Sequence, residues 1–141
     1  MSICLNDTWL RMDVLSLTVN NQPFLGKNFQ ISPGAINSDG MLDICLIENQ
    51  TSLWRTFLVI SKVLFGKHIY SSGVRTWQIK ELIITTDKPM SFLGDGEICQ
   101  EASEFKIEIL PKEVNVITAK TYTEAHNHSV SLAVAKTIVV A

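Results

Sequence analysis

Two carboxylates beside a tight turn are the side chains of this sequence best suited to chemistry. Asp95 and Glu97 lie in the run Gly94-Asp95-Gly96-Glu97. An Asp-Gly pair between two apolar segments predicts a β-hairpin, here over residues 90–99. Side chains two residues apart share one side of a strand, so the two carboxylates would lie together at or near an exposed tip. The alternative is a solvated turn with an acidic strand end, because a tight turn favours Asp-Gly in any case.

A second Asp-Gly turn lies far upstream. Asp39 precedes Gly40 in the loop 35–40, and Asp43 follows in the apolar run 41–48. These two carboxylates could form a metal pair, because hard cations prefer oxygen ligands. The alternative is a turn residue followed by an outward-facing strand residue.

The histidines offer further candidates. His68 follows the end of a predicted helix, where it could contact a phosphate or interact with the helix dipole. His126 and His128 could bind a metal ion as a His-x-His pair, or they could belong to a polar loop that holds no ligand.

Composition and charge narrow the function classes. The chain has 141 residues, the length of one domain with a real core, and a formal net charge of −2. A net charge of this sign gives no indication of the basic surface with which proteins bind nucleic acids. No apolar run reaches bilayer length, and residues 1–11 show no signal-peptide pattern.

Three widely spaced cysteines argue against a disulfide framework and a zinc site. They predict a reducing compartment, most simply the cytoplasm. Cys45 and Cys99 lie in apolar predicted strands, so we expect both to be inert core residues.

Hydrophobic periodicity predicts a mainly β chain. Residues 1–11 are mixed and support no assignment. Strands are predicted at 12–20, 41–48, 77–86, 90–99 as a hairpin, 105–109 with Pro111 as its end, and 114–117. Short strands with frequent turns are typical of a sandwich or an open barrel. We therefore expect a β-sandwich with one inserted α-helix.

Residues 52–66 carry the predicted helix. Its apolar residues recur at helical spacing, at Leu53, Phe57, Ile60, Val63 and Leu64. We expect this face to pack on the sheet. Thr51 or Ser52 can cap the start, and Gly66 stands where a C-cap would be. Trp54, Phe57 and Phe65 could instead form a lipid-facing stripe, with Trp54 at a membrane interface.

Four motifs, in order along the chain, are specific in combination. They are Ile31-Ser32-Pro33-Gly34-Ala35, then Ser38-Asp39-Gly40-Met41-Leu42-Asp43-Ile44, then a helix ending in Phe65-Gly66-Lys67-His68, then Gly94-Asp95-Gly96-Glu97. Together they resemble the C-terminal domain of the diacylglycerol kinase and sphingosine kinase superfamily, of the bacterial soluble lipid kinase type. The resemblance covers about residues 15–117.

The resemblance implies an enzyme part. Residues 1–117 would be the substrate-side β-sandwich domain of a lipid kinase that transfers the γ-phosphoryl group of ATP, with Mg²⁺, to a lipid hydroxyl. In this family a separate N-terminal domain holds ATP through a Gly-Gly-Asp-Gly-Thr-type loop, and no such loop occurs here. We therefore expect a fragment, a truncated gene product or one piece of a split assembly, inactive by itself.

The resemblance also implies roles for the candidate residues. Asp95 would match the general base, and Glu97 a residue at the phosphate and magnesium end of the site. Asp39 would hold a metal ion together with two backbone carbonyls, those of Ile36 and Met41. His68 would contact substrate or phosphate.

The implied partners are a lipid with a free hydroxyl and an ATP-binding domain or subunit. A cytoplasmic location, with peripheral contact at the inner leaflet, would follow. Residues 118–141 form a tail in which 132–140 predicts a strand that its own sheet, another domain or another subunit must cover.

Two other interpretations stay open from the sequence. One is a non-catalytic β-sandwich of the same ancestry that binds lipid or a partner. The other is an unrelated sandwich, which would place Asp39, Asp95 and Glu97 on surfaces with no shared cleft.

Overall fold

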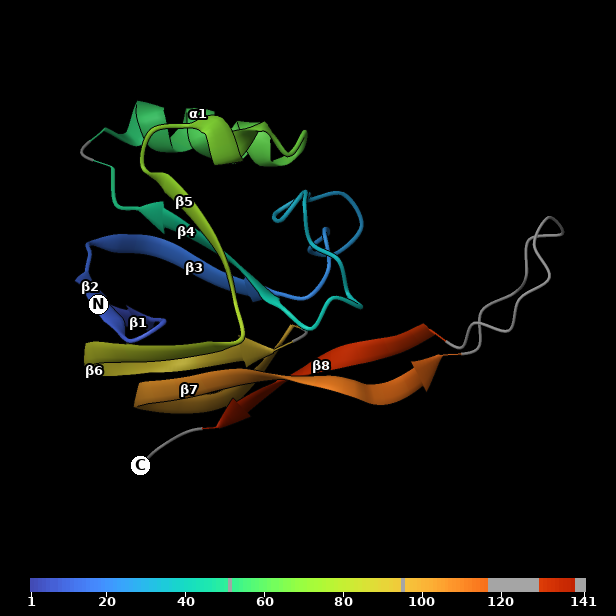
Figure 1. The fold of residues 1–141 in the computed structure, drawn as a ribbon. Helices are drawn as coiled ribbons and strands as arrows, with labels where there is room; N and C mark the ends of the chain where they lie inside the picture. Colours follow the sequence, from blue (N-terminus) through green and yellow to red (C-terminus); the bar gives the residue numbers. More distant parts are fainter. Residues whose placement is uncertain (51, 95, 117–129, 139–141) are drawn as a thin grey trace, which may run out of the picture.

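Two antiparallel sheets and one helix form three layers (Figure 1). This computed structural model describes residues 1–50, 52–94, 96–116 and 130–138. The elements are β1 (Ser2–Leu5), β2 (Thr8–Arg11), β3 (Val14–Asn20), β4 (Leu42–Glu48), α1 (Leu53–Val63), the 3₁₀ helix η1 (Lys67–Tyr70), β5 (Val74–Ile79), β6 (Glu81–Gly94), β7 (Glu97–Val116) and β8 (Val130–Ile138). The expected β-sandwich with one inserted α-helix is confirmed. Over these residues, no helix is both long and apolar enough to span a bilayer.

The five-stranded sheet has the order β2-β1-β6-β7-β8 and begins with a hairpin that sequence analysis missed. β1 and β2 pair from Ser2↔Arg11 to Leu5↔Thr8. Asn6 and Asp7 form the turn with φ values of 48° and 63°. Positive φ at both central positions suits the right-handed strand twist, and Asn and Asp tolerate it. The Asn-Asp pair was therefore the feature of the sequence from which this turn could have been predicted.

The three-stranded sheet, β3-β4-β5, is centred on β4. Its side chains alternate across the sheet, so Leu42, Ile44 and Leu46 join the sandwich core. Cys45 points the other way and packs with Ile31 and Val63 under the helix. β4 is consequently buried on both faces.

The core fills the space between the two sheets. Its buried members are Ile3, Leu5, Leu42, Ile44, Leu46, Ile79, Leu82, Ile84, Phe105, Ile107 and Ile109. They come from both sheets, so the two layers share one hydrophobic core.

The single strand predicted at 77–86 is wrong, because the chain changes sheets there. β5 ends at Ile79 and β6 starts at Glu81, with a bend at Lys80. Ile79 and Leu82 are both buried in the core although they lie in different sheets. This change of sheet explains why the apolar alternation is interrupted near Leu82.

β6 and β7 form one long hairpin that is sharply bent. Its register shifts between Thr85 and Met90. The rings of Phe92 and Phe105 nevertheless lie 5.8 Å apart between centroids, although Phe105 pairs with Ile84. The bend therefore folds the outer half of the hairpin back toward the core, where Phe92 packs.

The prediction that Pro111 ends a strand is also wrong. β7 continues through it to Val116, with a register shift between Leu110 and Val114. Lys112 takes up the irregularity with φ of 64°. Beyond the bulge, β8 pairs antiparallel with β7, so the C-terminal strand lies in the chain's own sheet.

The helix packs with a different face from the one expected. Among its residues only Val59 and Val63 are buried, whereas Leu53, Phe57, Ile60 and Leu64 are exposed. The packing prediction is thus wrong for these four residues. α1 is apolar around most of its circumference, so periodicity alone did not identify the inward side.

Close contacts at the end of α1 fix its position. Gly66 follows the helix with φ of 63°, and a Cβ there would lie 2.8 Å from Gln30 and from Pro33. The Gln30 N–H donates to the Val63 carbonyl oxygen at 3.2 Å. Ser52 is the N-cap residue but makes no side-chain cap hydrogen bond, and Thr51 lies outside the described residues.

The double burial of β4 predicts a large loss of stability on truncation. Leu46 is fully buried, so Leu46→Ala should lower the free energy of unfolding by about 2–5 kcal/mol. Leu93→Ala is the matched control, because Leu93 is 65% exposed and should change it little. Urea unfolding of both variants measures this, and equal losses would contradict the assigned core.

Candidate functional site

The β6–β7 turn is the tight hairpin that the Asp-Gly pair predicts. Gly94 pairs with Glu97 across a two-residue connection. Gly96 adopts φ of 91°, a conformation that side chains rarely take, so glycine suits this position. Asp95, the predicted general base, lies outside the described residues.

Glu97 is placed at the start of β7 with an exposed side chain. Within the described part of the chain, no ion pair or side-chain hydrogen bond engages its carboxylate. Leu93 and Ile98 beside it are 65% and 71% exposed. The tip therefore presents a carboxylate among apolar side chains, an arrangement open to a further layer of protein or to a ligand.

The core placement expected for Cys99 is wrong, because Cys99 is exposed. It lies on the outer half of the hairpin, where both strand faces are largely open to solvent. Cys45 is buried as expected, and burial raises the pKa of its thiol to about 11. A thiol with that pKa is unreactive at neutral pH.

The Asp39 loop brings three predicted residues together. The Asp39 N–H donates to the Ile36 carbonyl oxygen at 3.2 Å, and the Met41 N–H donates to Asp39 Oδ1 at 2.8 Å. Gly40 takes φ of 71° between them. These bonds close the turn, and within the described chain they leave Asp39 Oδ2 without a hydrogen-bond partner.

Asp43 is a buried carboxylate close to this loop. Its Oδ1 accepts a hydrogen bond from Gln78 Nε2 at 3.1 Å, while Oδ2 is buried with no partner among the described residues. Burial raises the pKa of Asp43; the Gln78 bond opposes the rise, and the charge of Asp39 adds to it. A cation beside Asp39 and Asp43 would satisfy Oδ2 and offset the repulsion.

His68 is fully buried under the loop that precedes β4. Its Nε2–H donates to the Ile31 carbonyl oxygen at 3.0 Å and lies 3.6 Å from Cys45 Sγ. Burial lowers the pKa of His68, against an opposing contribution from the Ile31 bond. This position gives the imidazole a packing role, and its contact with a phosphate stays a prediction.

Polar residues that were not among the candidates from the sequence surround these groups. Asn20 Nδ2 donates to Ser32 Oγ at 2.9 Å and to Thr18 Oγ1 at 3.3 Å. Thr18 Oγ1 in turn donates to the Cys45 carbonyl oxygen. The network joins β3 and β4 to the loop 21–41. The only sequence signal was polar residues at every second position of β3.

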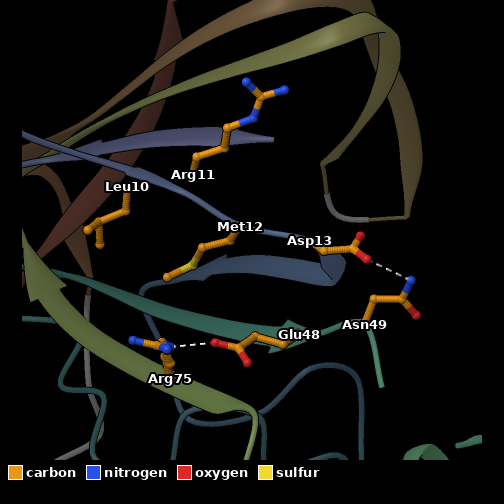
Figure 2. A pocket seen from close by; sticks show the side chains of 7 residues that line it. All are labelled: Leu10, Arg11, Met12, Asp13, Glu48, Asn49 and Arg75. Atoms are coloured by element: carbon orange, nitrogen blue, oxygen red, sulfur yellow. Dashed lines mark hydrogen bonds and ion pairs between the residues drawn. The ribbon is translucent and has the colours of Figure 1, made fainter. Parts of the chain in front are cut away.

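A separate open depression of about 410 Å³ lies at the β2–β3 connection (Figure 2). Arg75 Nε pairs with Glu48 Oε1 at 2.6 Å, and Asn49 Nδ2 donates to Asp13 Oδ2 at 3.2 Å. None of the described site candidates lines it. Because these polar groups pair with one another, we assign it no chemistry.

The three metal-loop residues and Glu97 belong to different parts of the fold. Gly40 lies against Pro111, near the far end of β7 from Glu97. In the described chain, no hydrogen bond or ion pair joins Glu97 to the Asp39 loop. The resemblance implies a site in a cleft between two domains. Such a cleft would form only together with the second domain.

Comparison with known proteins found a matching domain family and a related protein. The family model for the YegS C-terminal NAD kinase beta sandwich-like domain matches residues 1–118. The chain is 29% identical over 106 residues to the "putative lipid kinase YtlR" of Bacillus subtilis (strain 168), covering 75% of this chain and 34% of YtlR.

A solved structure shares the fold. It is the crystal structure of "a putative diacylglycerol kinase from Bacillus anthracis str. Sterne", with a TM-score of 0.64 and 23% sequence identity. The match covers 78% of this chain and 35% of that one. The chain thus spans about a third of the length of both relatives.

The buried His68 predicts a pH-dependent stability. Its folded pKa lies below the ordinary value of 6.5, so the unfolded chain binds the proton more readily. The free energy of unfolding should therefore fall as pH drops from about 7 to 5. His68→Gln keeps a donor without a titrating ring and should flatten that slope, as measured by urea unfolding across the pH range. His126→Gln removes one of the two candidate histidines, His126 and His128, that lie outside the described residues, and it is the control. A slope unchanged in His68→Gln would contradict the assignment.

The buried Asp43 predicts a stabilising substitution. Its folded pKa lies above the ordinary value of 3.8, so ionisation at neutral pH weakens the fold. Asp43→Asn keeps an acceptor for Gln78 and should raise the melting temperature at pH 7 in chelator, more than at pH 4. Asp87→Asn, at an exposed carboxylate, is the control.

Added Mg²⁺ extends this test. If a cation occupies the Asp39 and Asp43 carboxylates, Mg²⁺ should raise the melting temperature of the wild type and do so less in Asp43→Asn. A lower melting temperature of Asp43→Asn in chelator would contradict the inferred repulsion.

Proposed function

The chain belongs to the family of YegS C-terminal NAD kinase beta sandwich-like domains, and on that premise we propose that it is the substrate-side domain of a lipid kinase. The whole enzyme would transfer the γ-phosphoryl group of ATP to a lipid hydroxyl. Its relatives named as lipid and diacylglycerol kinases support this class of reaction. Both are roughly twice as long as this chain, since the matched segment is 34% of one and 35% of the other, which leaves room for a nucleotide domain.

One observation carries the proposal for the site. The Asp-Gly connection between β6 and β7 is a two-residue turn that starts β7 with an exposed Glu97. The turn lies inside the segment that the family model matches. A carboxylate carried at the start of a β-strand, as that of Glu97 is, is held more precisely than one in a loop.

Asp95 is assigned the role of general base. Its carboxylate would accept the proton of the lipid hydroxyl as that oxygen attacks phosphorus. Glu97 would help to hold Mg²⁺, and its exposed carboxylate, unengaged within the described chain, suits an oxygen-preferring cation. When bound, Mg²⁺ would neutralise the charge that develops on the phosphates, and ATP would supply the phosphoryl group.

A second cation would lie at the Asp39 loop, away from the chemistry. Asp39 and the carbonyls of Ile36 and Met41 would be its ligands, and the unpartnered Asp43 Oδ2 supports a positive charge there. This cation would hold the loop against β4. His68 is not included in the proposed machinery because it is buried.

The proposal predicts activity only when a nucleotide domain is present. The purified chain alone should phosphorylate no lipid. Fusion to the nucleotide domain of a related lipid kinase should give activity toward a lipid such as diacylglycerol. Asp95→Asn or Glu97→Gln should then lower kcat at least about a hundredfold, the size expected for removing a general base.

Matched controls separate chemistry from charge. Asp7→Asn changes an exposed aspartate in the other hairpin turn, and Glu101→Gln changes an exposed glutamate of β7. Both should keep full activity. A folded fusion with no activity would overturn the kinase proposal in favour of a non-catalytic lipid- or partner-binding module. Equal losses in the controls would overturn the roles assigned to Asp95 and Glu97.

A further inference from the structure

The β6–β7 hairpin is irregular just below its Asp-Gly turn. Phe92 of β6 pairs with Gln100 of β7. The next residue of β6, Leu93, pairs with Ile98. The pairing therefore skips Cys99, which is the extra residue of a β-bulge. Bulges are frequent next to active sites, where they change the direction of a side chain.

This bulge decides whether Glu97 belongs to a strand or to a loop. Regular pairing would place Gly94 opposite Ile98 and leave Glu97 in a three-residue loop. Because the bulge takes up one residue, Gly94 pairs with Glu97 instead. Glu97 is thereby the first residue of β7. The bulge thus gives the carboxylate of Glu97 a place in the ladder, where strand pairing limits its movement.

The thiol of Cys99 occupies the space that a side chain at position 94 would need. A Cβ on Gly94 would lie 2.8 Å from Cys99 Sγ and 3.8 Å from the Phe92 ring. Gly94 is not one of the glycines with positive φ, so its backbone conformation does not require glycine. The close approach of the thiol does require it.

The same sulfur lies across the base of the turn. Cys99 Sγ is 3.8 Å from the carbonyl oxygen of Glu97 and 4.0 Å from that of Gly94, so its S–H can donate to either. These two carbonyls flank the turn, one on each strand. A thiol is a weak donor, and Cys99 is exposed, so we expect the contact to add little stability. It can still favour one pairing register over the other.

We propose that the contact between Cys99 and Gly94 fixes the register of the turn and so positions the Glu97 carboxylate. Cys99 is then a positioning residue, which acts through Glu97 and needs no contact with substrate. The inference rests on the proposed function in one respect, that Glu97 helps to hold Mg²⁺. A displacement of about 1 Å, caused by a mutation away from the chemistry, can lower a rate about a hundredfold.

Nuclear magnetic resonance of the purified chain tests the register. The wild type should show cross-strand Overhauser contacts between Gly94 and Glu97. Gly94→Ala displaces the thiol and should replace these contacts by contacts between position 94 and Ile98. Gly34→Ala is the matched control, because a Cβ on Gly34 would meet no atom within 4 Å. It should leave the contacts of the turn unchanged.

Kinetics of the fusion with a nucleotide domain test the role in catalysis. Cys99→Ala should lower kcat roughly tenfold and raise the Mg²⁺ concentration that gives half-maximal activity. Cys99→Ser keeps a donor and should retain most of the activity. Gly94→Ala should match Cys99→Ala, and the double variant should lose no more than either, because both remove one contact. Ser91→Ala removes a hydroxyl from an exposed residue of β6 and is the control.

The contrary results distinguish the two proposals. An active fusion in which Cys99→Ala keeps the wild-type kcat and Mg²⁺ dependence would overturn the positioning role and leave the kinase proposal intact. Additive losses in the double variant, or contacts between position 94 and Glu97 that persist in Gly94→Ala, would do the same. A folded wild-type fusion without activity would overturn the kinase proposal and the positioning role together, whatever register the purified chain shows.

Discussion

The burial of β4 on both faces is the constraint on which the structure depends. From Leu42 to Ile47 every residue is buried. One face needs the large sheet, and the other needs the loop 21–41 and α1. Because neither layer can be removed without exposing apolar side chains, this strand holds the sandwich and the helix as one unit. Asp43 and His68 are polar groups enclosed in its outer layer.

The exposed surfaces are by-products of that arrangement. Val59 and Val63 are the buried residues of α1, and Val63 packs with Cys45, so the broad apolar remainder of the helix faces outward. The bent β6–β7 hairpin is held by Phe92 against Phe105 and ends in the Asp-Gly turn. A rigid core thus carries two features directed away from it, one acidic turn and one basic, apolar helix. In the proposed lipid kinase, the acidic turn is the feature that would face the nucleotide.

Much of the fold followed from local chemistry. The strands 14–20 and 42–48, the helix and the Asp-Gly hairpin carry strong periodic or turn signals, and the structure has them. The structural predictions were wrong where tertiary packing, and not the local sequence, determines the structure. The chain changes sheets at Lys80 with no glycine, proline or other turn residue to mark the change, and β7 passes Pro111 by means of a bulge. The packed face of α1 depended on the approach of Gln30 and Pro33 to Gly66, which no local pattern records. Likewise, the Asp39 turn was visible in the sequence, whereas the burial of His68 required the loop that covers it.

Photo-crosslinking from the nucleotide tests most directly whether the tip of the β6–β7 hairpin meets the phosphates of ATP. ATP with a photoreactive group on its γ-phosphate would be bound to the fused nucleotide domain of a related kinase, and labelled peptides would be sequenced. Our account predicts a label on the peptide that contains Gly94-Asp95-Gly96-Glu97, because this hairpin tip would face the phosphate. Labelling confined to the depression around Arg11 and Arg75, or to α1, would contradict this arrangement.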